Sequence, residues 1–511
     1  MKREIDPAVF FTAFVILLAA SLPIFFWPTQ AGPKIIATYD WIAENLGLLY
    51  QFSVIGAAVF LSWIAFGKHG KIRLGGDSEA PEFSTFSWMS MLFCGGVGAG
   101  LIYWATIEWG YYLDKPPFGV AAGTEEGRLL ATSYGLFHWG PFAWIIYALP
   151  TVAISYQFYV RKAPNLRLST ACHGLIKQPV PAAIFARVLD GLFMLSLLAG
   201  AGTSIGLAVP MISASLCDTF GIVRNLSIDI GVVLCSVSLI AISAFLGLSK
   251  GMSKLANFNV WMVFIFLLFI LITGPTQFIL RVGLESIGYM LSNIVRMVTY
   301  TDAIKRTGFV ESWTIFYWAW WIAYGPFVGI FVTRISKGRT LKELILSMAV
   351  FGSLGAWIFY VILGNYSYWL DLNGILSVRT LIKTSGSGQA VSAVMGTLPA
   401  GQVMRFIFAV ISIIFIAGTY NSKAYALAAS STKDLSVGDD PSRWNRVFWA
   451  LVLGMLPIAL MSIDGGIKIA MSAVLIASLP LLFISFLMSI NMVKSLKTHG
   501  EIDTHPELRD N

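Results

Sequence analysis

Two groups of aromatic residues are the part of this sequence that could bind a ligand. One group contains Trp144 and Tyr147, and the other contains Trp320, Trp321 and Tyr324. Residues three or four positions apart share a face of an α-helix, so each group would present several rings together. Each Trp or Tyr face attracts a cation by roughly 0.5–2 kcal/mol and needs no donor on that cation. Such a cage suits a trimethylammonium group, which is charged but has no N–H; an aromatic belt or a packing seam would use the same residues.

The composition indicates the kind of protein in which these rings lie. The chain has 511 residues, of which 57% are hydrophobic and 12% charged, and its mean hydropathy is +0.74. Soluble domains have about 25% charged residues. Apolar runs of about 20 residues, each long enough to cross a bilayer, recur along the chain. We therefore predict an all-α polytopic membrane protein in which residues 1–511 form a single transporter domain.

The apolar runs predict about 12 transmembrane helices. They are centred at about residues 18, 57, 98, 146, 200, 238, 268, 323, 354, 415, 454 and 480. Lys and Arg gather in alternate connections, such as those at residues 68–73 and 161–167. By the positive-inside rule, this pattern predicts that both termini are cytoplasmic, and we expect a multi-pass protein of a bacterial-type inner (plasma) membrane. Residues 281–306 form an exception and are expected to include an amphipathic helix along the outer interface.

Charge and cysteine usage argue against several other classes of function. The net charge of +8 is distributed over short loops, so it indicates membrane orientation and no nucleic-acid partner. The four cysteines show no CxxC spacing, and no nucleophile motif is present. We expect no cofactor, no metal site and no enzymatic activity. A channel or receptor for the same ligand is less consistent with the interrupted helices described next.

Two predicted spans contain helix-breaking residues. The third span contains the run Cys94–Gly100, in which Gly96, Gly98 and Gly100 alternate with small residues, and the eighth contains Tyr324-Gly325-Pro326-Phe327-Val328-Gly329. Matched interruptions in two halves of a transporter point to its binding site. Glycines in membrane helices also allow close packing without any break. The sequence leaves both interpretations open.

Lys423 and Glu108 are charged residues within predicted spans. An ammonium in the middle of a bilayer costs several kcal/mol unless it faces a cavity or a partner. Lys423 could therefore have a role in transport, or it could lie near the helix end and extend its ammonium to the interface. For Glu108 a structural partner is expected, with a gating role as the alternative, and for His138 a hydrogen-bonded structural role is expected.

Several motifs resemble those of the betaine/carnitine/choline transporter family. They are the glycine-rich third span, Phe137-His138-Trp139-Gly140-Pro141, Phe316-Tyr317-Trp318-Ala319-Trp320-Trp321, and the basic run Thr333–Arg339. The resemblance covers nearly the whole chain. It implies alternating-access transport of a small quaternary-ammonium solute across the lipid bilayer. It also implies a LeuT-type inverted repeat of five helices, formed by spans 3–7 and 8–12, and a homotrimer.

Within the family, the chain is similar to the carnitine/γ-butyrobetaine antiporter branch. Shared stretches include Ala80–Thr85, Tyr111-Tyr112 and Gly202–Ala208. The resemblance implies a substrate site and a further pair that lines the same cavity in betaine-type members. The implied site residues are Tyr111, Trp139, Trp320, Trp321 and Tyr324, and the further pair is Trp144 and Tyr147.

Departures from the family pattern concern the ion sites. Asn259 and Val328 stand where that antiporter branch has an arginine and a methionine, and Thr419 is preceded by Gly418 instead of a second hydroxyl. Leu197 and Ala201 replace a pair of threonines associated with sodium binding. The resemblance thus implies impaired sodium coupling and favours sodium-independent exchange, with Lys423 supplying the missing charge. The alternative is a sodium- or proton-coupled uptake symporter for betaine or choline. Gly100 replaces an acidic residue of some proton-coupled choline members, which favours a zwitterionic substrate.

Overall fold

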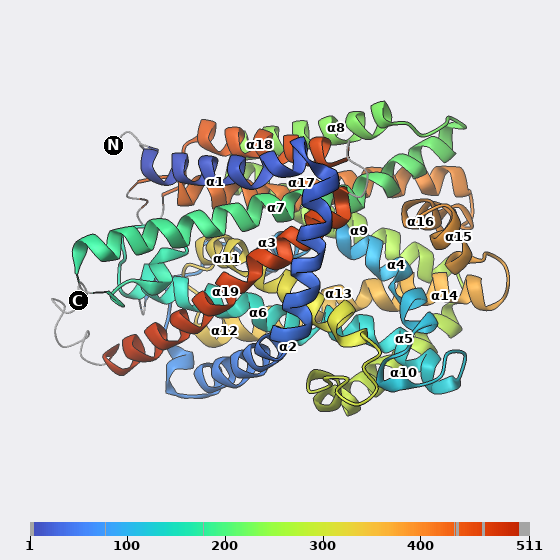
Figure 1. Cartoon of the computed structure of the whole chain (residues 1–511), viewed down its shortest axis with the longest axis horizontal. Helices are drawn as coiled ribbons and strands as arrows, with labels where there is room; N and C mark the ends of the chain where they lie inside the picture. The colour runs from blue at the N-terminus through green and yellow to red at the C-terminus, as the bar shows by residue number, and fades with distance from the viewer. Residues whose placement is uncertain are drawn as a thin grey trace.

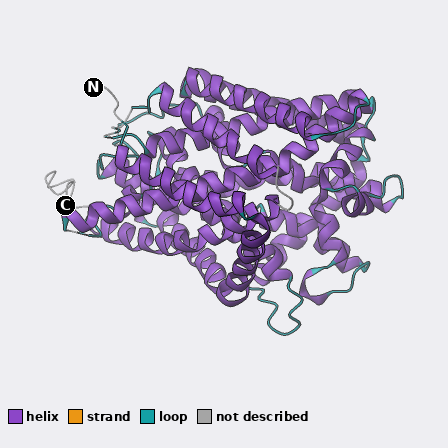
Figure 2. Ribbon diagram, turned by 45° about the horizontal axis from the view of Figure 1, so that its top comes forward, coloured by secondary structure: helices purple, strands orange, loops and turns teal. Residues whose placement is uncertain are grey.

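The computed structural model describes residues 5–76, 78–176, 178–433, 435, 439–461 and 466–499. Helices account for most of these residues, as Figure 2 shows. β structure within the described ranges is limited to the isolated bridges Ile5–Thr432 and Arg73–Thr340. The predicted all-α class is therefore confirmed.

The helices follow one another with short connections. The longer ones are α1 (Pro7–Phe26), α2 (Pro28–Phe66), α3 (Thr85–Gly96), α4 (Ala99–Asp114), α5 (Glu125–His138), α6 (Pro141–Ser155), α7 (Pro179–Phe220), α8 (Leu226–Leu246), α9 (Ser253–Thr273), α10 (Thr276–Val298), α11 (Phe316–Ile335), α17 (Gly401–Ser430), α18 (Arg443–Met461) and α19 (Gly466–Lys497). The shorter ones are α12 (Leu341–Leu346), α13 (Ser353–Phe359), α14 (Asn365–Leu372), α15 (Val378–Thr384) and α16 (Ser387–Gly396). Two π-helical turns, Ser347–Gly352 and Tyr360–Gly364, join α12, α13 and α14 into one continuous helical stretch.

The centre of the molecule is formed by α11 and α6, which pack along each other (Figure 1). Every residue of α11 is buried, and most of these residues are apolar or aromatic. A helix that is apolar all round is stable only when other helices surround it. Helix α1 lies with α8 and α18 along one side of the body, and α2 crosses the view steeply. The aromatic residues of α11 therefore lie inside the bundle.

The number of membrane-spanning helices is close to the predicted one. Among the described residues, 10 helices are long and apolar enough to cross a membrane, or 11 if α3 and α4 count as one bent span. Helices occupy all the positions that the sequence predicts, but α1 and α18 are not among those 10 or 11. Helix α10, predicted to lie along the interface, is one of the 10 by length and composition.

The third predicted span is broken, as expected. Helix α3 ends at Gly96, α4 begins at Ala99, and the two helices meet at an angle of 65°. Val97 and Gly98 between them adopt extended backbone conformations. The amides of the first turn of α4 therefore lack partners within the helix, and the positive end of its dipole points into the protein.

The predicted break in the eighth span is wrong, because α11 continues from Phe316 to Ile335 with Pro326 in its interior. The glycines on either side of Pro326 serve close packing instead. A Cβ on Gly325 would lie 3.3 Å from Pro150 Cγ, and one on Gly329 would lie 3.1 Å from the Thr151 backbone nitrogen. Membrane helices tolerate proline when neighbouring helices pack around it. The motif thus brings α11 against α6.

Replacing Gly329 with valine is expected to destabilise the protein by about 1–3 kcal/mol, the usual cost of overpacking. The added carbons would meet the backbone of Pro150 and Thr151, which cannot rotate away as a side chain can. Gly288→Val in α10 is the matched control, since a Cβ there meets nothing within 4 Å. Thermal unfolding of the purified variants in detergent measures the difference. Equal stability of the two variants would show that α6 and α11 do not need this close approach.

The two ends of the described chain lie at the same end of the molecule. Asp6, before α1, forms an ion pair with Arg167 at 3.0 Å. Near the end of α19, the Ser495 carbonyl accepts a hydrogen bond from Arg161 at 3.3 Å. Both partners belong to the basic segment that follows α6. Both ends of the described chain are therefore anchored on the same basic segment.

Candidate functional site

The aromatic groups predicted from α6 and α11 meet in the interior. Trp139 follows the last residue of α5, and its ring centre lies 4.7 Å from that of Trp321, with the ring planes at 73°. Tyr147 contacts Trp321 at 5.8 Å and 78°, and Trp144 contacts Tyr147 at 5.8 Å and 89°. These four residues are almost completely buried. Edge-to-face contacts of this kind leave ring faces turned in several directions.

The α11 residues extend the cluster by stacking. Trp320 stacks on Trp321 with the ring centres 5.5 Å apart and the planes at 11°, and Tyr324 lies 6.1 Å from Trp320 at 67°. Six of the seven predicted site residues are thus connected through ring contacts. We call these six residues the aromatic cage; they are Trp139, Trp144, Tyr147, Trp320, Trp321 and Tyr324.

Tyr317 also belongs to this cluster, although the sequence analysis did not select it. Its ring stacks on Trp320 at 6.2 Å and on Trp321 at 5.5 Å, and it contacts Trp139 at 5.8 Å. The signal was available, since Tyr317 precedes Trp320 by three residues and Trp321 by four, which places it on the same helix face.

Tyr111 lies one layer of rings away from the aromatic cage. Its ring contacts Trp313 at 5.5 Å and Trp104 at 6.2 Å, and both of these contact Tyr317 at 6.4 Å. The Tyr111 hydroxyl is 3.0 Å from the Ser387 hydroxyl. Tyr111 is half-buried, so its position fits the entrance to the cage better than its interior.

A short turn positions the cage residues that α5 and α6 contribute. The amide of Trp139 donates to the Gly135 carbonyl at the end of α5, and Pro141 is the first residue of α6. Proline favours this position because its fixed φ angle suits the first helical turn. Gly96, at the end of α3, leaves room for Trp144, since a Cβ there would lie 2.8 Å from the Trp144 ring.

The cage has polar edges as well as aromatic faces. Trp321 Nε1 donates to the His138 carbonyl at 3.0 Å, which fixes the orientation of that ring. In contrast, Trp139 Nε1, Trp320 Nε1 and the Tyr147 hydroxyl are buried with no hydrogen-bond partner among the described residues. A stranded buried donor costs about 1–3 kcal/mol, so these groups would be stabilised by an acceptor that enters the cage. They could donate to the carboxylate of a zwitterion held in the cage.

Lys423 lies beside the cage, in the C-terminal third of α17. Its side chain is 0% exposed, and its Nζ lies 3.3 Å from the Ser204 hydroxyl. The ammonium also lies 4.7 Å from the ring centre of Tyr324 and 4.5 Å from that of Tyr420, within cation–π range. Within the described residues, no Asp or Glu forms an ion pair with it. The alternative in which Lys423 extends to the membrane interface is therefore wrong.

The break between α3 and α4 lies against α17. The Thr419 hydroxyl is 3.0 Å from the carbonyl oxygen of Cys94, in the last turn of α3, and 3.0 Å from that of Val97, which follows α3. A Cβ on Gly98 would lie 2.8 Å from Thr419 Oγ1, so glycine allows this close approach. Gly100 has open space around its Cβ position. Two carbonyls and one hydroxyl thus converge at the break between the two helices.

The other predicted ion-site residues contribute few oxygen ligands. Asn259 Nδ2 lies 3.7 Å from Cys94 Sγ, while Asn259 Oδ1 has no partner among the described residues. Val328 and Leu197 are fully buried and offer no polar atom. The side chain of Ala201 lies outside the described part of the structure.

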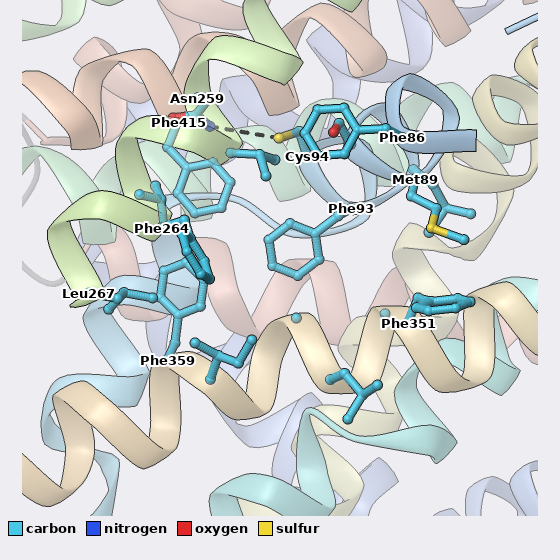
Figure 3. A pocket seen from close by; sticks show the side chains of 18 of the residues that line it. Phe86, Met89, Phe93, Cys94, Asn259, Phe264, Leu267, Phe351, Phe359 and Phe415 are labelled. Carbon is cyan, nitrogen blue, oxygen red and sulfur yellow. Dashed lines mark hydrogen bonds between the residues drawn. The ribbon is translucent and has the colours of Figure 1, made fainter. Parts of the chain in front are cut away.

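A separate cavity of about 300 Å³ lies between α3, α9 and α13 (Figure 3). Figure 3 shows phenylalanine rings lining it, among them Phe93, Phe359 and Phe415, with the Asn259–Cys94 contact on its wall. No residue of the aromatic cage lines this cavity. Several lining residues, such as Phe264 and Phe351, are exposed, so the cavity opens on the apolar outer surface of the bundle.

Glu108 forms a buried polar network next to the cage. Its carboxylate accepts hydrogen bonds from the hydroxyls of Tyr112 and Tyr360. The Tyr112 hydroxyl is 2.8 Å from His138 Nδ1, and His138 Nε2 is 3.1 Å from the Thr314 hydroxyl. Glu108 and His138 are 0% exposed. These contacts fit the structural roles expected for both residues, since each polar atom finds a partner.

Comparison with known protein families identifies the family of this chain. Residues 8–501, nearly the whole chain, match the family described as BCCT, betaine/carnitine/choline family transporter. The family has the LeuT fold, and its members are transporters without enzymatic activity. A quaternary-ammonium solute is the ligand that this membership implies, and the aromatic faces of the cage suit it. The chain therefore belongs to the betaine/carnitine/choline transporter family and is a secondary transporter of compounds of that type.

Proposed function

We propose that this transporter exchanges zwitterionic trimethylammonium compounds, such as carnitine, γ-butyrobetaine or betaine, without using sodium. The observation that carries the proposal is the buried ammonium of Lys423, which lies 4.7 Å from the ring of the cage residue Tyr324. A fixed positive charge at this place can do what a bound cation does in an ion-coupled carrier. The resemblance to the carnitine/γ-butyrobetaine antiporter branch supports the same mode.

The surroundings of Thr419 support sodium independence. Sodium needs several oxygen ligands, and Thr419 is preceded by Gly418, which offers no second hydroxyl. The carbonyls of Cys94 and Val97 already lie within hydrogen-bond distance of the Thr419 hydroxyl. Val328, fully buried nearby in α11, adds no ligand.

In the proposed cycle, the cage holds the ammonium while the helix bundle rocks between outward-facing and inward-facing states. The rings of Trp139, Trp320 and Trp321 provide the faces that balance the charge without fixing a carboxylate in the bilayer. Exchange requires that the loaded carrier reorients quickly and the empty carrier slowly. The carriers of this fold class rock around a site near the middle of the bilayer, and the cage is the site proposed here.

The test is uptake of labelled L-carnitine into proteoliposomes. The vesicles are preloaded with γ-butyrobetaine or left empty, each with and without an inward sodium gradient. The proposal expects uptake that requires preloading and does not change with sodium. Uptake into empty vesicles driven by sodium would contradict exchange and would leave the cage unaffected.

A sodium- or proton-coupled uptake symporter for betaine or choline is the second candidate. The oxygens at the α3–α4 break favour it, since Thr419 Oγ1 and two carbonyls already converge there. Asn259 Oδ1, which has no hydrogen-bond partner among the described residues, offers a further oxygen. The empty-vesicle condition of the same experiment distinguishes the two candidates.

The proposal also includes a location and an assembly. We place the protein in a bacterial-type inner membrane with both termini cytoplasmic, which the alternating Lys and Arg content of the loops supports. A homotrimer is expected from the family resemblance. Cross-linking of the protein in its native membrane would test the assembly.

A further inference from the structure

Lys423 presents an unusual arrangement of hydrogen bonds and charge. An ammonium has three N–H donors, and one of them reaches an acceptor, the Ser204 hydroxyl at 3.3 Å. The Tyr324 and Tyr420 rings lie next to the ammonium at 4.7 and 4.5 Å. Within the described residues, no carboxylate pairs with it. A buried charge is stabilised best by an opposite charge, and none of the described carboxylates supplies one.

The contacts of Tyr324 indicate where a negatively charged partner for Lys423 could come from. This ring contacts the Lys423 ammonium on one side and belongs to the aromatic cage through Trp320, 6.1 Å away. The Tyr324 hydroxyl is held in place by the Gly200 carbonyl and by Ser204, whose hydroxyl lies 2.8 Å away. A solute whose ammonium rests on Trp320 and Trp321 is therefore one ring away from Lys423.

The charge of the solute then decides how well it fits. A choline-like cation in the cage would place a second positive charge near Lys423 in a low-dielectric interior, where like charges repel strongly. A zwitterion brings one negative charge with its positive one, so the net charge of the site stays the same on binding. Its carboxylate, joined to the ammonium by a short carbon chain, can extend toward the free N–H groups of Lys423.

We infer that the Lys423 ammonium binds the carboxylate of the solute and thereby selects zwitterionic over purely cationic trimethylammonium compounds. This deepens the proposed function, because it rests on the substrate class proposed there but not on the transport mode. Lys423 would act as a specificity residue, whereas the aromatic cage would bind the ammonium of either class. A buried charge without an opposite charge is costly, and a carboxylate that also finds hydrogen-bond donors there offsets that cost.

The test measures equilibrium binding of γ-butyrobetaine and choline to the purified full-length protein in detergent. The wild type is expected to bind γ-butyrobetaine at least tenfold more tightly than choline. Lys423→Met keeps an unbranched side chain that is one atom shorter and removes its charge, so it should weaken γ-butyrobetaine binding at least tenfold and leave choline binding equal or stronger. Lys423→Arg, the charge-preserving control, should retain the preference. An unchanged ratio in Lys423→Met, or an equal loss for both ligands, would overturn the inference.

A second measurement uses the wild type alone and does not depend on the folding of a variant. The methyl ester of γ-butyrobetaine has the same trimethylammonium group but lacks the carboxylate charge. The inference expects the ester to bind at least tenfold more weakly than the acid, and equal affinity would contradict it. If the wild type bound none of these ligands, both the proposed substrate class and the role of Lys423 would be wrong. If it bound them all equally well, the substrate class would stand and only the role of Lys423 would be wrong.

Discussion

Replacing Trp321 with leucine is expected to weaken binding of γ-butyrobetaine by about 2- to 30-fold, which corresponds to roughly 0.5–2 kcal/mol for one aromatic face. Trp321 contacts three other cage residues, since Trp139, Tyr147 and Trp320 all meet it. Leucine keeps much of the apolar volume but has no π face. Isothermal titration of the purified protein measures the effect.

Trp318→Leu is the matched control for this variant. Trp318 lies on the same helix and is equally buried, but its ring packs on Phe137 at 5.5 Å and on Phe142 at 6.1 Å, away from the cage. This control should lower stability without changing affinity. Trp321→Phe should retain part of the affinity because it keeps a π face. If both leucine variants bound equally well, Trp321 would not be a ligand-binding residue.

Glu108→Ala is expected to lower the free energy of unfolding by about 1–3 kcal/mol, because it strands the buried hydroxyl of Tyr360 and leaves the Tyr112 hydroxyl with His138 Nδ1 as its remaining partner. Both hydroxyls donate to this carboxylate in the interior, where water cannot replace it. Thermal unfolding in detergent measures the loss. Because the network includes His138, whose carbonyl fixes Trp321, ligand binding should also weaken.

The control for Glu108 is Glu285→Ala, which removes an exposed carboxylate from α10 and should change stability little. Glu108→Gln keeps one acceptor oxygen and should be less destabilising than alanine. Equal unfolding temperatures for Glu108→Ala and Glu285→Ala would mean that the tyrosine hydroxyls find other partners, and would remove Glu108 from the structural network.

Residue spacing predicted the parts of the site that depend on a single helix. The i, i+3 and i, i+4 relations among Trp320, Trp321 and Tyr324 are local, and the structure places these rings together. The meeting of α5, α6 and α11 is not local, so the contact between Trp139 and Trp321 followed only from the family resemblance. Tyr317 was missed although the same spacing rule includes it.

The misinterpreted features are those whose meaning depends on a neighbouring helix. Glycines around a proline, such as Gly325 and Gly329, can end a helix or let another helix approach closely. In this structure they let α6 approach α11. For Lys423, the sequence alone left its depth in the bilayer undecided, because that depends on where α17 begins and ends. Periodicity shows which face a residue occupies, but the partner on that face comes from the tertiary fold.

The most direct test of the aromatic cage compares γ-butyrobetaine with its uncharged-headgroup analogue, 5,5-dimethylhexanoate, in equilibrium binding to the purified protein. The two molecules have the same shape and the same carboxylate, and they differ in whether nitrogen or carbon carries the three methyl groups. Because several ring faces each contribute roughly 0.5–2 kcal/mol to a cation, the account predicts at least tenfold tighter binding of γ-butyrobetaine. Equal affinities would show that the site recognises shape alone and would contradict binding through cation–π contacts.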